Sequence, residues 1–411
     1  MPNRPSVLHN YHGAVVRLWI PVVDEIALCH GSDVVQVLVN ACLRRIKRFL
    51  ANNSAKPIYG LLRTQQVKAL GLGAFEINFE SRPSARTMID WGKNLCTHVQ
   101  RPLRVNALPF VLYPKVRIGI DLPKTFKKSA SPMRAQCSLD SATTTEPVCI
   151  YQEAIQRKKL DQLQLESEIR RGLKRHEFIS YFQPKVDPET RSVAGAEALV
   201  RWHKPGHGIL LPREFLHVAE QSELIHEIGK TVADQTINLL DRLVEKGKEI
   251  PVSINLSDRD LDHDSFIPSL KGKLQARNID AQLISFEVSE KIAAIKNARH
   301  TSFFTMIRRA GFELALDDFG TSYSSLARLT RFPIREIKFD RDFISQAKRS
   351  SRGMNLLVSI GQMLLQNDYR VTIEGIEKPN ELQLLKALPG CLVQGFYFSP
   401  AVPSRDLERL L

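Results

Sequence analysis

Cysteine is scarce in this sequence, and its placement indicates neither a metal site nor a disulfide framework. The six cysteines among 411 residues form no Cys-x-x-Cys pair and have no histidine at zinc-ligand spacing. Long apolar runs are missing too, because the most apolar N-terminal stretch, 14–29, is interrupted by Arg17, Pro21, Asp24 and Glu25. Free thiols suit a reducing cytosol, so we expect a cytoplasmic protein without a membrane span.

Acidic residues are also few in the N-terminal third. Before Tyr151 the sequence has 20 Lys and Arg against 9 Asp and Glu, a net charge of +11, whereas the remainder has 38 against 35. Positive charge attracts acidic partners such as nucleic acid, lipid headgroups or nucleotides, but it does not determine a fold. A nucleic acid or protein partner of the basic N-terminal part is therefore an open alternative.

The length and the 43% hydrophobic content predict two or three domains, each with its own core. A β-branched run at 14–23, an amphipathic pattern at 31–50 and strand-like runs at 74–79 and 116–120 predict a small α+β domain over residues 1–149. Residues 123–147 are rich in Ser, Thr, Ala, Lys and Pro without periodicity, which predicts a flexible linker or loop. Residues 150–172 predict a polar connecting helix.

From residue 173 to 411, short β-rich runs alternate with longer helical stretches. Eight such runs in about 240 residues match the size and rhythm of a (β/α)8 barrel of the TIM type. The expected strands lie at 179–184, 193–202, 252–256, 284–288, 312–317, 335–339, 370–374 and 392–396.

Polar residues stand at or near the carboxyl ends of most of these strands. They are Asn255, Glu287, Asp317, Lys338, Glu374 and Gln394, with Glu197 inside the second strand. Alone, each would be a solvated loop residue, but in a barrel these strand ends meet on one face. Carboxylates gathered there repel unless a cation neutralises them, and oxygen ligands without Cys or His favour Mg²⁺ or Mn²⁺. A lysine among them could position a water for phosphoryl hydrolysis.

The motifs around these residues resemble the ordered signature of EAL domains, the cyclic di-GMP phosphodiesterases. The runs are EALVRW from Glu197, NLS from Asn255, EVSE from Glu287, DDFGT from Asp317, KFD from Lys338, EGIE from Glu374 and QGF from Gln394. The resemblance covers about 173–411. It implies an α/β barrel whose first strand can run antiparallel to the others, and hydrolysis of cyclic di-GMP to linear pGpG with two Mg²⁺ or Mn²⁺ ions.

The resemblance also implies roles for individual residues. The implied ligands of the two metal ions are Glu197, Asn255, Glu287, Asp317 and Asp318. The implied catalytic residues are Lys338 and Glu374, which would position and activate water, and Glu290, which would brace the loop after Asp317. The implied substrate-binding residues are Arg201, Gln394 and Leu199, and a homodimer through the barrel is implied as well. Ser322 replaces a family glycine in that loop, where a left-handed backbone would be strained.

The N-terminal domain resembles a degenerate GGDEF domain, the cyclase module that frequently precedes an EAL domain. The resemblance depends on HGSD at 30–33, GLGAF at 71–75 and RIGI at 117–120. The carboxylates that a cyclase needs for Mg²⁺ and triphosphate are missing from Leu72-Gly73-Ala74, so we expect no synthesis and a regulatory role. An unrelated α+β domain stays open.

Two other functions remain open at this point. An EAL barrel that binds cyclic di-GMP but turns it over slowly or not at all could act as a receptor or adaptor that signals through the basic N-terminal domain. The N-terminal domain could also serve as a nucleic-acid or protein adaptor. We favour the phosphodiesterase, because all of the motif carboxylates, the asparagine and the lysine are present.

Overall fold

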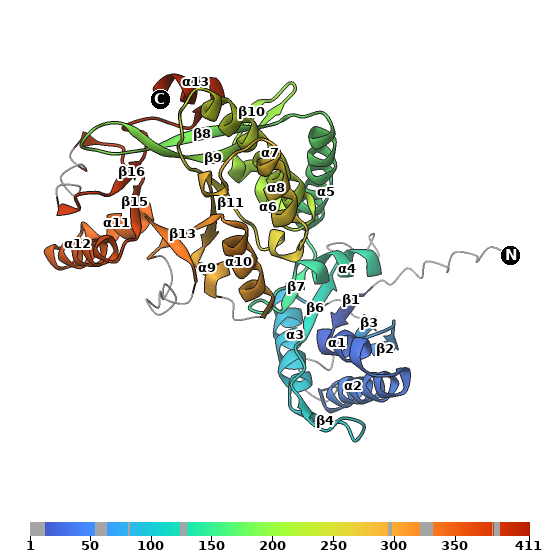
Figure 1. Ribbon diagram of the computed structural model, residues 1–411. Coiled ribbons are helices and arrows are strands. Elements are labelled where there is room, and N and C mark those ends of the chain that lie inside the picture. Colours follow the sequence, from blue (N-terminus) through green and yellow to red (C-terminus); the bar gives the residue numbers. More distant parts are fainter. Residues whose placement is uncertain are drawn as a thin grey trace. The chain divides into compact units, whose positions relative to one another are not determined.

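The computed structural model describes residues 13–53, 64–80, 83–123, 130–294, 298–320, 332–379, 381 and 387–411. The chain divides into two compact units, Met1–Leu163 and Gln164–Leu411, and the division falls within helix α5, Glu153–Lys174 (Figure 1). Among the described residues, no helix is long and apolar enough to cross a membrane.

The first unit contains a five-stranded sheet in the order β2-β3-β1-β6-β7. β1 runs antiparallel to β3 and β6, and β7 joins β6 in parallel. Its strands and helices are β1 Val15–Trp19, α1 Pro21–Cys29, α2 Ser32–Asn53, β2 Thr64–Ala69, β3 Ala74–Phe79, α3 Ala85–Val99, β6 Arg117–Asp121, α4 Pro132–Ser141 and β7 Val148–Ile150, with a separate hairpin of β4 Leu103–Arg104 and β5 Val111–Leu112. Trp91 of α3 packs edge-on against Phe49 and Phe79 in the core.

Two expectations for this unit are wrong. The strand expected over 14–23 ends at Trp19, because Pro21 begins α1. The segment 123–147, expected as a flexible linker or loop, contains α4, which buries Ala135, Ser138 and Leu139. Gly119 allows this close packing, since a Cβ there would lie 2.2 Å from the Ala135 carbonyl oxygen and the Leu139 nitrogen. A buried face of three residues, with Leu139 as its one large apolar side chain, gives little hydrophobic periodicity in a sequence, so the pattern did not predict this helix.

The second unit is a closed barrel, and all eight expected strands are present. They are β8 Phe178–Val186, β9 Val193–Lys204, β11 Val252–Asn255, β12 Ile284–Ser289, β13 Glu313–Phe319, β14 Ile334–Phe339, β15 Arg370–Glu374 and β16 Leu392–Gln394. β9 and β11 to β16 pair in parallel in this order. β8 closes the barrel by pairing antiparallel with both β9 and β16. The antiparallel first strand is therefore confirmed.

Helices cover the outside of the barrel with their apolar faces, and all but the C-terminal α13 connect parallel strands. They are α6 Pro212–Ala219, α7 Leu224–Glu245, α8 Phe266–Gln275, α9 Glu290–Ala294, α10 Ala298–Ala310, α11 Arg341–Ala347, α12 Ser351–Gln366 and α13 Ser404–Leu410, with short 3-10 turns at Asp260–Asp262 and Ala281–Leu283 and short strands β10 Gly208–Leu210 and β17 Val402–Pro403. Phe178, Trp202 and Phe215 stack beside β8 and β9. The outer packing fixes the strands whose inner side chains form the site.

Candidate active site

Seven side chains predicted for the site lie together at one end of the barrel, six of them at or near the carboxyl ends of their strands and Glu197 inside β9. Strand register explains part of this, since Asn255 lies beside Glu287 across β11 and β12, and Glu374 lies beside Gln394 across β15 and β16. The seven are Glu197, Asn255, Glu287, Asp317, Lys338, Glu374 and Gln394, which come from β9 and β11 to β16 in turn. Their convergence follows from barrel closure.

Lys338 occupies the centre of this group and is 1% exposed. Its Nζ lies 3.0 Å from Glu197 Oε2, 2.6 Å from Glu287 Oε2, 3.3 Å from Asp317 Oδ1 and 2.7 Å from Glu374 Oε1. Burial lowers the pKa of Lys338, but the attraction of these carboxylates outweighs it and raises the pKa well above its usual value. One ammonium group therefore faces four carboxylates.

Two amides hold Glu197 in place. Asn255 Nδ2 donates to Glu197 Oε1 at 2.8 Å, and Gln394 Nε2 donates to Glu197 Oε2 at 2.7 Å. Gln394 also donates to Gln183 of β8 at 3.2 Å. These bonds orient the buried Glu197 carboxylate without adding positive charge.

The carboxylates of the site differ in how well they are neutralised. Burial raises the pKa of Asp317 to about 6 and that of Glu374 to about 8, and the neighbouring carboxylates add to the effect of burial. Glu287 is the opposite case: burial raises its pKa, but Lys338 and Lys185 outweigh burial and lower the pKa to about 2. The site therefore carries more buried negative charge than its lysines neutralise.

The oxygen atoms of the site are of the types that bind a hard divalent cation. The carboxylate oxygens of Glu197, Glu287 and Asp317 and the amide oxygen of Asn255 are the ligand types that Mg²⁺ and Mn²⁺ prefer. The buried Oδ1 of Asp317 accepts no hydrogen bond. Among the described residues, no group of three or more His, Cys, Asp or Glu side chains is arranged so that it could hold a metal ion.

A cavity of about 300 Å³ opens over these residues. It includes Leu199, as predicted for a substrate-binding residue, and also Gln183, Arg341, Glu377 and Phe396, which the sequence analysis did not select. Arg341 and Glu377 form a 2.6 Å ion pair at the rim. Arg341 directly follows the quoted motif KFD and Glu377 is the last residue of the quoted motif EGIE, which is the signal that could have identified them.

The other predicted residues lie around this group. Arg201 is two residues beyond Leu199 on β9, where its guanidinium packs 5.7 Å from the Tyr181 ring centre and burial lowers its pKa. Asp318 is exposed, with a positive φ of 57° at an irregularity in β13. Glu290 is buried at the start of α9. Ser322 and the loop that Glu290 was expected to brace lie outside the described residues.

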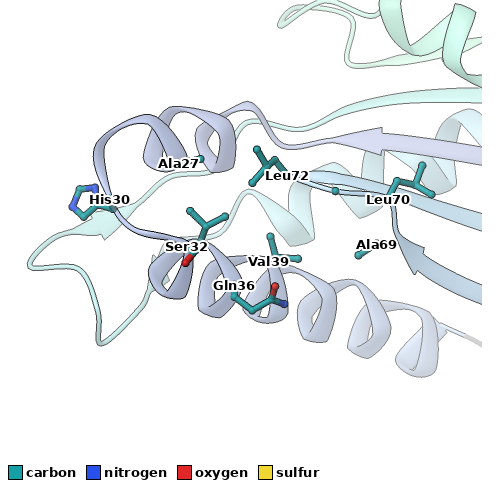
Figure 2. Close-up of a pocket in the computed structure, with 10 residues that line it drawn as sticks. Ala27, His30, Ser32, Gln36, Val39, Ala69, Leu70 and Leu72 are labelled. Carbon is teal, nitrogen blue, oxygen red and sulfur yellow. The ribbon is translucent and has the colours of Figure 1, made fainter.

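A second cavity, of about 670 Å³, lies in the N-terminal unit between α1, α2 and the β2–β3 hairpin (Figure 2). It is lined by Gly71 and Leu72, the first two residues of the GLGAF run expected at the position of a cyclase site. The residues lining it in the described part of the chain include no Asp or Glu; they are Ala27, His30, Ser32, Val35, Gln36, Val39, Ala69, Leu70, Gly71 and Leu72. This lining offers no carboxylate for a nucleotide-bound Mg²⁺.

Comparison with known proteins gives a consistent picture of the barrel. The family model described as EAL domain matches residues 166–401. The oxygen sensor protein DosP of Escherichia coli (strain K12) is 27% identical over 99% of this chain and 51% of DosP. The cyclic di-GMP phosphodiesterase PdeR of the same organism is 27% identical over 86% of this chain and 53% of PdeR. The chain thus spans about half the length of these two relatives.

A solved structure resembles the barrel as well. The phosphodiesterase PaMucR in complex with c-di-GMP is 29% identical, with a TM-score of 0.56 over 59% of this chain and 99% of that chain. The expected EAL-type barrel is therefore confirmed. A GGDEF origin of the N-terminal unit stays a prediction.

Proposed function

The chain belongs to the EAL domain family, and from this premise we propose that its barrel hydrolyses cyclic di-GMP to linear pGpG with divalent cations. The observation that carries the proposal is the group of four carboxylates around Lys338 at the open end of the barrel. Relatives named as cyclic di-GMP phosphodiesterases, and an EAL structure in complex with c-di-GMP, support the substrate.

The proposed metal ligands are Glu197, Asn255, Glu287, Asp317 and Asp318. Two Mg²⁺ or Mn²⁺ ions bound there would neutralise the excess of carboxylates and stabilise the charge that develops on the phosphate oxygens.

The chain's own groups would direct the proton and the water. Glu374 Oε1 lies 2.7 Å from Lys338 Nζ, so the pair can share a proton, and we assign both residues to positioning and activating the attacking water. The raised pKa of Glu374 makes it a better proton acceptor whenever it is ionised. Gln394 and Leu199 line the cavity, and Arg201 lies farther along β9 for a substrate phosphate.

The experiment is an incubation of the full chain with cyclic di-GMP and Mn²⁺, with chromatographic detection of pGpG. Hydrolysis in Mn²⁺ and its loss in EDTA would support the proposal. A stable complex with cyclic di-GMP without pGpG would instead identify the chain as a receptor. The variant Lys273→Met is a matched control, because Lys273 of α8 forms a half-exposed ion pair with Asp234 of α7 on the helices outside the barrel.

We also propose that the N-terminal unit regulates the barrel and synthesises no cyclic di-GMP. The carboxylate-free cavity at Leu70–Leu72 supports the absence of synthesis. The continuous helix α5, which spans the division between the units, could transmit a change from one to the other. A homodimer through the barrel and a cytoplasmic location stay predictions, of which light scattering would test the first.

A further inference from the structure

A second lysine, Lys185, lies inside the barrel below Lys338 and is 3% exposed. It follows Gln183 by two residues on β8, so both side chains point inward. β8 runs opposite to its neighbours, so Lys185, which follows Gln183 on the inner face, lies deeper in the barrel. Gln183 pairs with Glu197 of β9, whereas Lys185 pairs with Gly195. The lysine therefore enters a layer beneath the predicted site.

Small residues leave room for this side chain. A Cβ at Gly195 would lie in ordinary van der Waals contact with Lys185 Cδ, at 3.8 Å, whereas a larger side chain would extend into its space. Ser253 and Ser285 face each other across β11 and β12 in the same layer. Lys185 Nζ crosses this space to donate to Ser253 Oγ at 2.7 Å, Glu287 Oε1 at 3.0 Å and Glu336 Oε1 at 2.6 Å. All three donor positions of the ammonium are used.

Glu287 connects the two layers. Its Oε1 accepts from Lys185 below, and its Oε2 accepts from Lys338 at the mouth, at 2.6 Å. With one oxygen fixed from below, the carboxylate has a single orientation in which Oε2 faces the other carboxylates of the site. A ligand held in this way loses little freedom when it binds a cation.

A purely structural role is the competing explanation. Glu336 is buried and accepts from Lys185 and from Thr372 Oγ1, at 2.7 Å, so the Lys185–Glu336 pair could serve only to neutralise itself. That role would require neither the additional bond from Lys185 to Glu287 nor the bond from Lys185 to Ser253 Oγ.

We propose that Lys185 is a positioning residue, which holds the Glu287 carboxylate so that Oε2 is presented to a divalent cation at the mouth of the barrel. The inference rests on the proposed function for the identity of the site, but it concerns metal affinity and not the substrate.

The test compares two variants of the full chain, Lys185→Met/Glu336→Gln and Glu336→Gln alone. The double variant removes one positive and one negative charge from the lower layer, so it leaves no unpaired buried ion and preserves the net charge. The single variant keeps the bond from Lys185 to Glu287. Mn²⁺ binding is measured by titration calorimetry without substrate, thermal unfolding is measured in EDTA, and kcat and KM are measured for cyclic di-GMP.

We expect the double variant to bind Mn²⁺ about 10-fold to 100-fold more weakly than the unmodified chain, the range typical of losing a group that orients a metal ligand. Its unfolding temperature in EDTA should match that of Glu336→Gln, whose Mn²⁺ affinity should stay within about threefold of the unmodified chain. Equal Mn²⁺ affinity in both variants would overturn the inference and leave Lys185 a structural residue. Weaker Mn²⁺ binding in a chain that hydrolyses no cyclic di-GMP would uphold the inference while refuting the proposed function.

Discussion

The substitution Lys338→Met tests the central feature of the site, one ammonium group among four carboxylates. Methionine has a similar length and no charge, so the change removes the cation with little loss of volume. Four carboxylate oxygens lie within 3.3 Å of the Lys338 Nζ that is removed. Removing one partner of a buried ion pair costs about 3–5 kcal/mol, because the remaining charge is uncompensated.

The barrel unit comprises Gln164–Leu411, a size at which 1 kcal/mol lowers the unfolding temperature by about 2–4 °C. In EDTA we therefore expect Lys338→Met to unfold about 6–20 °C below the unmodified chain. Mn²⁺ at about 100 times its dissociation constant adds about 2.7 kcal/mol. Since a more negative site binds cations more tightly, Mn²⁺ should recover more stability in the variant than in the unmodified chain.

Hydrolysis should respond differently from stability. In saturating Mn²⁺ we expect kcat of Lys338→Met to fall about 100-fold or more, the scale of losing one acid, base or charge-stabilising group. Differential scanning calorimetry in EDTA and in Mn²⁺, beside the hydrolysis assay, measures both effects, with Lys273→Met as the control that should change neither. An equal loss of stability in EDTA and in Mn²⁺ would refute the charge argument, and a lower affinity for cyclic di-GMP with unchanged kcat would reassign Lys338 to binding.

The remaining predictions concern the ligands, the pH and the N-terminal unit. Glu197→Ala should abolish hydrolysis, since a carboxylate ligand is lost; turnover near the unmodified rate that still requires metal would refute the role of Glu197. The raised pKa values of Asp317 and Glu374, about 6 and about 8, predict that the metal-free barrel loses stability as the pH rises from about 4 to 8, because the folded state holds protons that the unfolded state has released. Denaturant unfolding in EDTA should show this slope and Mn²⁺ should reduce it, whereas stability that rises with pH over this range would contradict the assignment. A shortened chain that begins at Gln162 should keep metal-dependent hydrolysis but differ from the full chain in rate or assembly, and identical kinetics and assembly would refute regulation by the N-terminal unit. Neither chain should convert GTP to cyclic di-GMP, and any GTP-derived product would refute the loss of the cyclase site.

The sequence alone predicted the barrel and the seven side chains that meet at its mouth. Eight β-rich runs at regular spacing are a local property of the chain, and parallel strands in a closed barrel must bring their carboxyl ends to one face. The positions of Asn255, Glu287 and Lys338 at those ends therefore predicted their convergence before any contact was known. The antiparallel first strand followed only from resemblance to a family.

Tertiary structure alone decided which side chains touch and how their charges balance. Lys185 lies in an ordinary strand pattern, and only the reversed direction of β8 and the small residues of the facing strands place its ammonium beneath Glu287. Helix α4 also depends on a tertiary contact that the sequence pattern does not show. Its buried residues, Ala135, Ser138 and Leu139, pack closely against Gly119. Contacts of this kind join residues more than 50 positions apart in the barrel, and their energies depend on burial and distance, which hydrophobic periodicity and residue spacing do not contain.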